Sequence, residues 1–123
     1  MELIPVHLFK NISLTGSKAI CDPAPLGTDI DFVGLAALPL STMCSILVKP
    51  RHKWEYTGRA GYKNTNTFDT YRKFEYNLIV VADPIYYMQW VVATQLAKKK
   101  NLLKKEDRIN LFRTVLNERE NSS

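Results

Sequence analysis

The alternation of hydrophobic and polar residues predicts two strands in the first third of the chain. Residues 12–15 alternate and end at a Gly-Ser pair. Residues 29–34 alternate again, with the apolar side chains on one face and two aspartates on the other. Between these strands, Pro23 and Pro25 limit residues 18–21 to one turn of helix.

The middle of the chain is expected to contain one helix and further strands. Apolar residues recur with helical spacing and predict an amphipathic helix over residues 39–49. Residues 54–57 are expected to form a short strand, and residues 58–66, rich in glycine and asparagine, a loop. Residues 68–72 and 75–82 are expected to pair as a hairpin, whose LIVV run is typical of a strand covered on both faces.

Two helices are expected to close the chain. Asp83 and Pro84 suit the cap and first turn of a helix whose apolar stripe should face inward; the stripe consists of Ile85, Met88, Val92 and Leu96. A last helix is predicted over residues 105–117. Together the elements predict a single α+β domain over residues 1–123: a small mixed β-sheet with helices packed on it and a basic helical C-terminus at 84–119.

Composition narrows the class of protein. With 123 residues, 46% of them hydrophobic and 24% charged, the chain is composed like an ordinary globular domain, which excludes wholesale disorder. No apolar run reaches about 18 residues, so no membrane span is expected. No export signal is evident and there are only two cysteines, so we expect a cytoplasmic protein with reduced thiols. The oligomeric state is not determined by the sequence.

The positive charge is concentrated near the C-terminus. The net charge is +5, and eight of the 17 lysines and arginines lie between Lys98 and Arg119. Such a distribution suits a polyanionic partner such as a nucleotide or RNA. A lysine-rich solvated helix face explains it equally well.

Asp29 and Asp31 are the first candidates for chemistry. On a strand, residues two apart point to the same face, so the carboxylates would lie roughly 6 Å apart. Two like charges at that distance repel by on the order of 3 kcal/mol at an effective dielectric of about 20. A cation between them would remove this repulsion, and Mg²⁺ prefers one or two carboxylates together with substrate phosphates. The other reading is a strand end with two solvated acids.

A second candidate stands at the end of the first predicted strand. Gly16 permits a close approach of backbone N–H groups to a phosphate, the Ser17 hydroxyl adds a donor, and Lys18 adds a positive charge. Alone, a Gly-Ser pair is only a turn signal. Joined to Asp-x-Asp, it gives a pattern of an apolar strand, Gly-Ser, eleven residues, and then alternating aspartate and apolar residues.

This pattern, LTGS at 14–17 followed by DIDF at 29–32, resembles the signature of the polymerase-β-like nucleotidyltransferase superfamily in a minimal single-domain form. The YNLIV and DRINLF segments are also similar to small nucleotidyltransferase-like proteins of bacteriophages, which would act in the host cytoplasm. In the superfamily a third acid comes from a later strand. Glu75 is the best match, and Asp69 competes for this role.

The resemblance implies a Mg²⁺-dependent transfer of a nucleoside monophosphate from an NTP, such as ATP, to a protein or RNA acceptor. Asp29, Asp31 and Glu75 would bind two Mg²⁺ (or Mn²⁺) ions and act in catalysis. Gly16, Ser17 and Lys18 would bind the nucleotide: Gly16 and Ser17 would hold the phosphates, and either Lys18 or the loop residues Arg59 and Lys63 would neutralise charge. The loop at 58–66 would close over the nucleotide.

Two other functions remain open. The chain could be a catalytically weak or inactive protein of the same fold that binds a host protein or nucleic acid. It could also be a basic RNA-binding module whose acids are incidental, in which case RNA affinity would depend steeply on salt.

Overall fold

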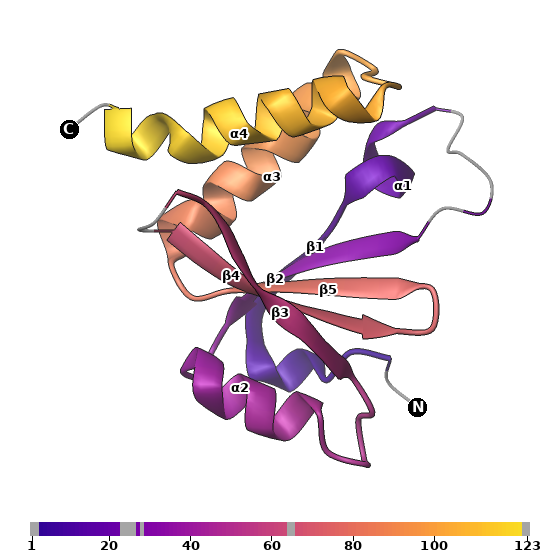
Figure 1. Cartoon of the computed structure of the whole chain (residues 1–123), viewed down its shortest axis with the longest axis vertical. Coiled ribbons are helices and arrows are strands. Elements are labelled where there is room, and N and C mark those ends of the chain that lie inside the picture. Colours follow the sequence, from indigo (N-terminus) through magenta and orange to yellow (C-terminus); the bar gives the residue numbers. More distant parts are fainter. Residues whose placement is uncertain (1–2, 23–26, 28, 64–65, 122–123) are drawn as a thin grey trace.

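The computed structural model describes residues 3–22, 27, 29–63 and 66–121. Its centre is a five-stranded mixed sheet in the order β1-β2-β5-β4-β3, with helices on both faces (Figure 1). The strands are β1 (Phe9–Thr15), β2 (Ile30–Ala36), β3 (Glu55–Lys63), β4 (Asn66–Lys73) and β5 (Tyr76–Val81). The helices are the 3-10 helix η1 (Val6–Leu8), α1 (Gly16–Ile20), α2 (Leu40–Leu47), α3 (Pro84–Lys99) and α4 (Lys105–Asn121). The expected α+β class with a mixed sheet is confirmed.

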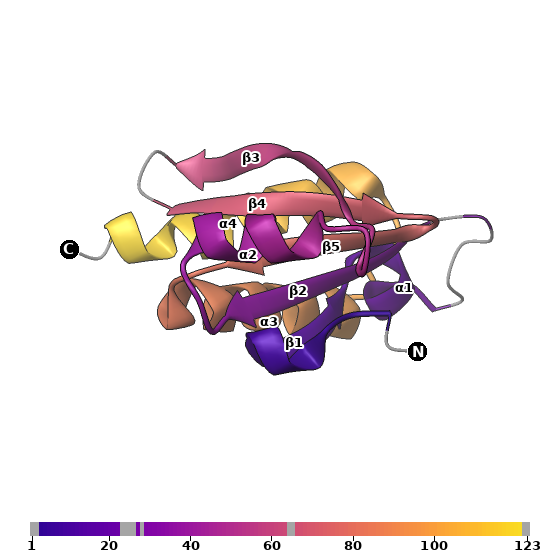
Figure 2. The ribbon, with the colours of Figure 1, turned by 90° about the horizontal axis from the view of Figure 1, so that it is seen from below.

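The two strands β2 and β5 form the parallel centre of the sheet, and every other neighbouring pair is antiparallel. Helices α1, α3 and α4 cover one face, and η1 and α2 cover the other (Figures 1 and 2). Because the centre is covered on both sides, its side chains are buried from both directions, as Val33, Leu78 and Val80 show. The expectation that the LIVV run is covered on both faces is therefore confirmed.

Each face of the sheet has its own hydrophobic core. Under α3 and α4 the core is built around Trp90, whose ring meets Phe68 and Phe112 edge to face at centroid distances of 5.0 and 5.8 Å. Under η1 and α2 it contains Met43, Leu47, Trp54 and Tyr71, all buried. These contacts hold both helical layers against the sheet and fix the strand ends that carry the candidate site.

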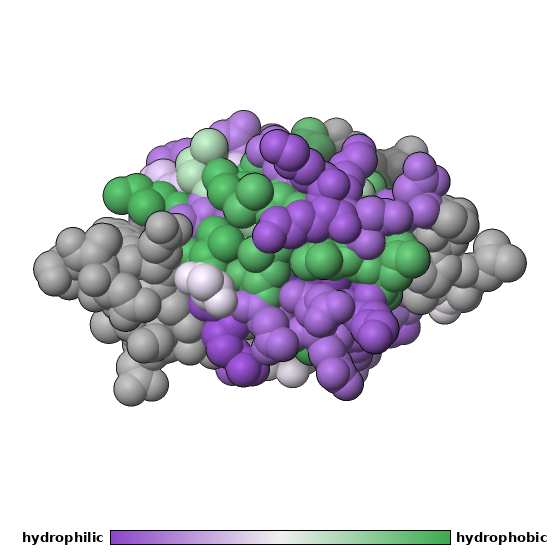
Figure 3. Space-filling view, turned by 90° about the horizontal axis from the view of Figure 1, so that it is seen from above, coloured by the Kyte–Doolittle hydropathy of each residue, from purple (hydrophilic) through white to green (hydrophobic). Residues whose placement is uncertain are grey.

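The helix α3 begins as predicted but presents the opposite face to the core. The Asp83 carboxylate accepts a hydrogen bond of 2.8 Å from the Ile85 backbone N–H. The buried residues are Tyr86, Tyr87, Trp90, Ala93, Thr94 and Ala97. The stripe expected to face inward is 37–56% exposed, and exposed hydrophobic surface runs across this side of the molecule (Figure 3). The prediction is wrong because aromatic rings bury more apolar area and alanines permit close helix packing.

The prediction of a loop over residues 58–66 is also wrong. Residues 58–63 continue β3, the edge strand, which pairs with β4 along its length. Gly58, at φ +136, lies where the register shifts, so glycine here marks a bulge and not the end of the strand. Residues 64 and 65, like Pro23 and Pro25, lie outside the described residues. Residues 58–63 therefore do not form the loop that was expected to close over the nucleotide.

None of the helices in the described part of the chain combines the length and apolar character needed to cross a lipid bilayer.

Candidate functional site

A row of polar residues crosses four strands at one end of the sheet. Thr15 on β1 is the register partner of Asp31 on β2, and Asp31 is the partner of Asn77 on β5. Asn77 is in turn opposite Arg72 on β4. Directly opposed residues of neighbouring strands point to the same face. The four side chains thus converge on the face covered by α1, α3 and α4.

Hydrogen bonds join this row to Asp29, which immediately precedes β2. The Asn77 side-chain amide donates to Asp31 Oδ1 at 2.9 Å and to Asp29 Oδ2 at 3.2 Å. The Arg72 guanidinium donates to both oxygens of Asp29, at 2.9 and 3.2 Å. The Asn77 amide therefore bridges the two aspartates, and the Arg72 cation pairs with Asp29 alone.

The two aspartates have opposite electrostatic environments. Hydrogen bonds from Arg72, and then from Asn77, lower the pKa of Asp29 below its ordinary value. Burial raises the pKa of Asp31 above its ordinary value, against the opposing effect of the Asn77 hydrogen bond. Asp31 therefore carries the less satisfied negative charge, which a bound cation would stabilise.

Gly16 brings the Gly-Ser pair directly against Asp31. It begins α1 with φ +70, a left-handed conformation that glycine adopts without strain. A β-carbon at this position would lie 2.1 Å from Asp31 Oδ2, far inside van der Waals contact. The two sequence motifs, separated by eleven residues in the chain, therefore meet in space, and only glycine fits at position 16.

Buried hydrogen bonds tie the end of β1 to α3. The Trp90 indole N–H donates to Thr15 Oγ1 at 3.2 Å, and the hydroxyls of Thr15 and Thr94 lie 2.7 Å apart. All three residues are buried. Because Thr15 directly precedes Gly16, this cluster fixes the position of the Gly-Ser pair relative to the helical layer.

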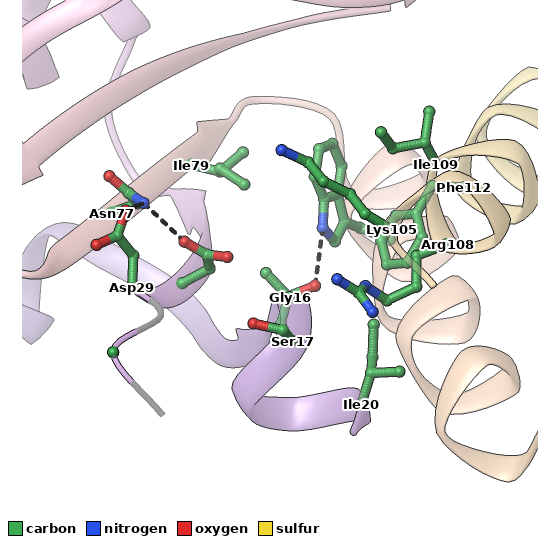
Figure 4. Close-up of a pocket in the computed structure, with 14 residues that line it drawn as sticks. Gly16, Ser17, Ile20, Asp29, Asn77, Ile79, Lys105, Arg108, Ile109 and Phe112 are labelled. Atoms are coloured by element: carbon green, nitrogen blue, oxygen red, sulfur yellow. Dashed lines mark hydrogen bonds between the residues drawn. The ribbon is translucent and has the colours of Figure 1, made fainter. Parts of the chain in front are cut away.

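These elements surround an open pocket of about 530 Å³ (Figure 4). One wall carries Gly16, Ser17, Asp29 and Asn77, and Lys105 and Arg108 extend into the pocket from α4 on the other side. The remaining lining is Thr15, Ile20, Gly27, Asp31, Ile79, Trp90, Ile109 and Phe112. The pocket therefore combines carboxylates, backbone N–H groups, two cations and an apolar floor.

Most predicted site residues meet in this pocket, but Lys18 and Glu75 do not. Neither is among the described residues that line it. Glu75 is exposed in the turn between β4 and β5, where its backbone carbonyl accepts a hydrogen bond from the Ile30 N–H at 2.9 Å. Asn77, two residues further on, stands beside Asp31 instead.

The competing third acid, Asp69, is committed elsewhere. It is buried on β4, and its carboxylate accepts hydrogen bonds from Arg59 at 2.7 and 3.2 Å. Arg59, expected to neutralise phosphate charge, therefore pairs with Asp69. Neither residue is among the described residues that line the pocket.

Asn77 was not among the predicted site residues, and Lys105 and Arg108 were predicted only as members of the C-terminal basic cluster. The sequence does contain a signal for Asn77, because this polar residue directly precedes the apolar run LIVV of β5. Nothing in the chain order indicates that the start of α4 lies opposite Gly16.

The donor set suits a hard cation. Among the described residues, no three histidine, cysteine, aspartate or glutamate side chains form a group that could hold a metal ion. Asp29 and Asp31 nevertheless offer two carboxylates beside the Asn77 amide, and Mg²⁺ is commonly held by one or two carboxylates together with substrate phosphates. The residues present therefore fit Mg²⁺ that enters with a phosphate ligand.

Comparison with family models, curated proteins and solved structures finds no match for this chain.

Proposed function

We propose that the chain is a Mg²⁺-dependent nucleotidyltransferase, with a fold of that type, which moves a nucleoside monophosphate from an NTP to a protein or RNA acceptor. The observation that carries the proposal is the contact between Gly16 and Asp31. It places a Gly-Ser turn and an Asp-x-Asp pair, the two motifs of the resemblance, at one end of one pocket.

Each part of the pocket has a role in such a transfer. Gly16 and Ser17 offer backbone N–H groups and a hydroxyl to the phosphates. Asp29 and Asp31 would hold Mg²⁺, as one or two ions, which would supply positive charge to polarise the α-phosphate and to neutralise the leaving pyrophosphate. An acceptor hydroxyl oxygen forms a bond to the α-phosphorus, the bond to the bridging oxygen breaks, and pyrophosphate leaves with that electron pair. The hydroxyl proton passes to solvent.

Binding of the cation requires a rearrangement of the aspartate pair. Arg72 and Asn77 hold three carboxylate–donor contacts to Asp29. A Mg²⁺ ion would replace these donors as the partner of the two carboxylates. Arg72, whose side chain is exposed, is then free to contact a phosphate or the acceptor.

A second candidate function rests on Asn77. Where the superfamily pattern has a third acid on a neighbouring strand, this chain places a neutral amide beside Asp31. Loss of that charge favours a protein that binds a nucleotide and a partner but transfers weakly or not at all.

Label transfer separates the two functions. Purified protein is incubated with each α-labelled NTP, Mg²⁺ and a bacterial lysate divided into protein and RNA fractions. An Asp29→Asn/Asp31→Asn variant is compared with an Asp22→Asn/Asp107→Asn variant, which removes the same charge from two exposed positions. Transfer predicts label in one fraction with wild type and the control variant only. Absence of label with all proteins, despite nucleotide binding, supports the binding protein.

A further inference from the structure

The wall of the pocket that faces the carboxylates is formed by α4, near the end of the chain. Lys105 is its first residue and Arg108 follows three positions later, so both lie on one side of the helix. Both line the pocket, and both extend toward the wall that carries Gly16, Ser17 and Asp29 (Figure 4). Cations from one helix thus face carboxylates and a Gly-Ser turn across a single cavity.

Arg108 fixes this helix in place. Its Nη1 donates to the backbone carbonyls of Leu102 and Leu103, at 3.1 and 2.8 Å, and lies 3.3 Å from Cys21 Sγ. Leu102 and Leu103 belong to the connection between α3 and α4, and Cys21 follows α1. The start of α4 is therefore held at a set position relative to the Gly-Ser turn.

Lys105 differs from Arg108 in its surroundings. It is exposed at its helix terminus and lines the same pocket as Asp31. A long side chain with a compact charge at its end binds phosphate as a point charge. A Mg²⁺ ion on Asp29 and Asp31 would hold phosphate oxygens at one wall, and the phosphate chain would extend from there toward α4.

We propose that Lys105 binds the terminal phosphates of the nucleotide, so that α4 makes the pocket selective for nucleoside triphosphates over monophosphates. This inference rests on the proposed nucleotide site and names a residue and a substrate preference within it. It also gives a role to part of the C-terminal basic cluster other than RNA binding.

The test is a titration with nucleotides of different phosphate number. The NTP that wild-type protein binds most tightly is titrated calorimetrically in Mg²⁺, followed by its diphosphate and monophosphate. Lys105→Gln is compared with Lys104→Gln, a neighbouring exposed lysine that is not among the described lining residues and removes the same charge. We expect Lys105→Gln to weaken NTP binding by about tenfold or more and monophosphate binding by less than about twofold, with Lys104→Gln unchanged.

Three results would overturn the inference. Equal NTP affinities of the two variants would reject a role of Lys105 in phosphate binding while leaving the proposed function intact. An equal loss for NTP and monophosphate would place Lys105 away from the terminal phosphates. If wild-type protein binds none of the nucleotides, the proposed function and this inference fail together. Circular dichroism of both variants checks that neither result comes from unfolding.

Discussion

A β-carbon on Gly16 would lie 2.1 Å from the Oδ2 of Asp31, so these two residues can hold their positions only if position 16 is glycine. We expect Gly16→Ala to lower the free energy of unfolding by about 2–4 kcal/mol, because it adds a collision to a left-handed backbone conformation. Urea unfolding measures this loss.

Gly27→Ala is the matched control for that substitution. Gly27 has φ +75, close to that of Gly16, but no atom of the described residues lies within 4 Å of its would-be β-carbon. Gly27→Ala should therefore lower the free energy of unfolding only by the cost of the left-handed backbone conformation, about 1 kcal/mol. Equal losses at both positions would contradict a close contact between Gly16 and Asp31.

The two aspartates are expected to respond to neutralisation with opposite signs. Asp31→Asn should raise the melting temperature at neutral pH, since burial penalises the charged form of Asp31. Asp29→Asn should lower it slightly, because the Arg72 pair is lost. Differential scanning calorimetry at pH 7 gives both shifts. Two shifts of the same sign would contradict the assigned environments.

The pH dependence of these variants follows from the directions of the pKa shifts. The Asp31 pKa is raised, so its contribution to stability is complete below the ordinary value of 3.8 and is lost as pH rises through the raised value. The advantage of Asp31→Asn should thus grow over this interval and then stay constant. The Asp29 pKa is lowered, so its contribution is present above 3.8 and is lost at more acidic pH. Melting temperatures measured from about pH 2.5 to about pH 7 test both pH dependences.

Asn77→Asp should convert the aspartate pair into a three-carboxylate site. Without metal, we expect a loss of about 1–3 kcal/mol, because a third negative charge replaces the donor shared by Asp29 and Asp31. Mg²⁺ should restore more stability to this variant than it adds to wild type. Thermal melts with Mg²⁺ and with EDTA measure the difference, and Asn110→Asp, on the exposed side of α4, controls for added charge. A Mg²⁺ response equal to that of the control would argue against a cation at this place.

Thr15→Val should break the buried cluster that holds the Gly-Ser pair. It removes the acceptor of the Trp90 indole N–H and the Thr15–Thr94 hydroxyl pair, while Thr94 keeps its hydrogen bond to the Trp90 carbonyl; losing these buried hydrogen bonds costs about 1–3 kcal/mol. Thr57→Val is the control, since it breaks an equally short threonine pair, 2.7 Å, at an exposed position and should cost less than about 0.5 kcal/mol. Urea midpoints compare the two.

Much of the fold could be predicted from local signals in the sequence. Alternation identified β1 and β2, helical spacing identified α2, and the Asp83-Pro84 pair identified the start of α3. The direction in which α3 faces could not be predicted in this way. Its aliphatic stripe and its aromatic and alanine-rich face both have helical spacing, and only the neighbouring Phe68 and Phe112 decide which one is buried.

The candidate site was predictable only where its residues are close in sequence. Asp31 lies on β2 and Asp29 immediately precedes that strand, and Gly16 follows the end of β1 beside them. Asn77 depends on the parallel register of β2 with β5, and Lys105 on how α4 lies over the sheet. Such long-range pairings leave no local pattern. Gly58 is another example: a glycine there suggested a loop, but long-range pairing with β4 keeps this residue in a strand.

The most direct test of the account is calorimetric titration of the protein with each NTP, in Mg²⁺ and in EDTA. The account predicts that at least one NTP binds in Mg²⁺, at least about tenfold more weakly in EDTA, and that Asp29→Asn/Asp31→Asn removes the Mg²⁺ effect while the protein stays folded. Binding of equal strength in EDTA, or in the double variant, would contradict a magnesium nucleotide site at these two aspartates.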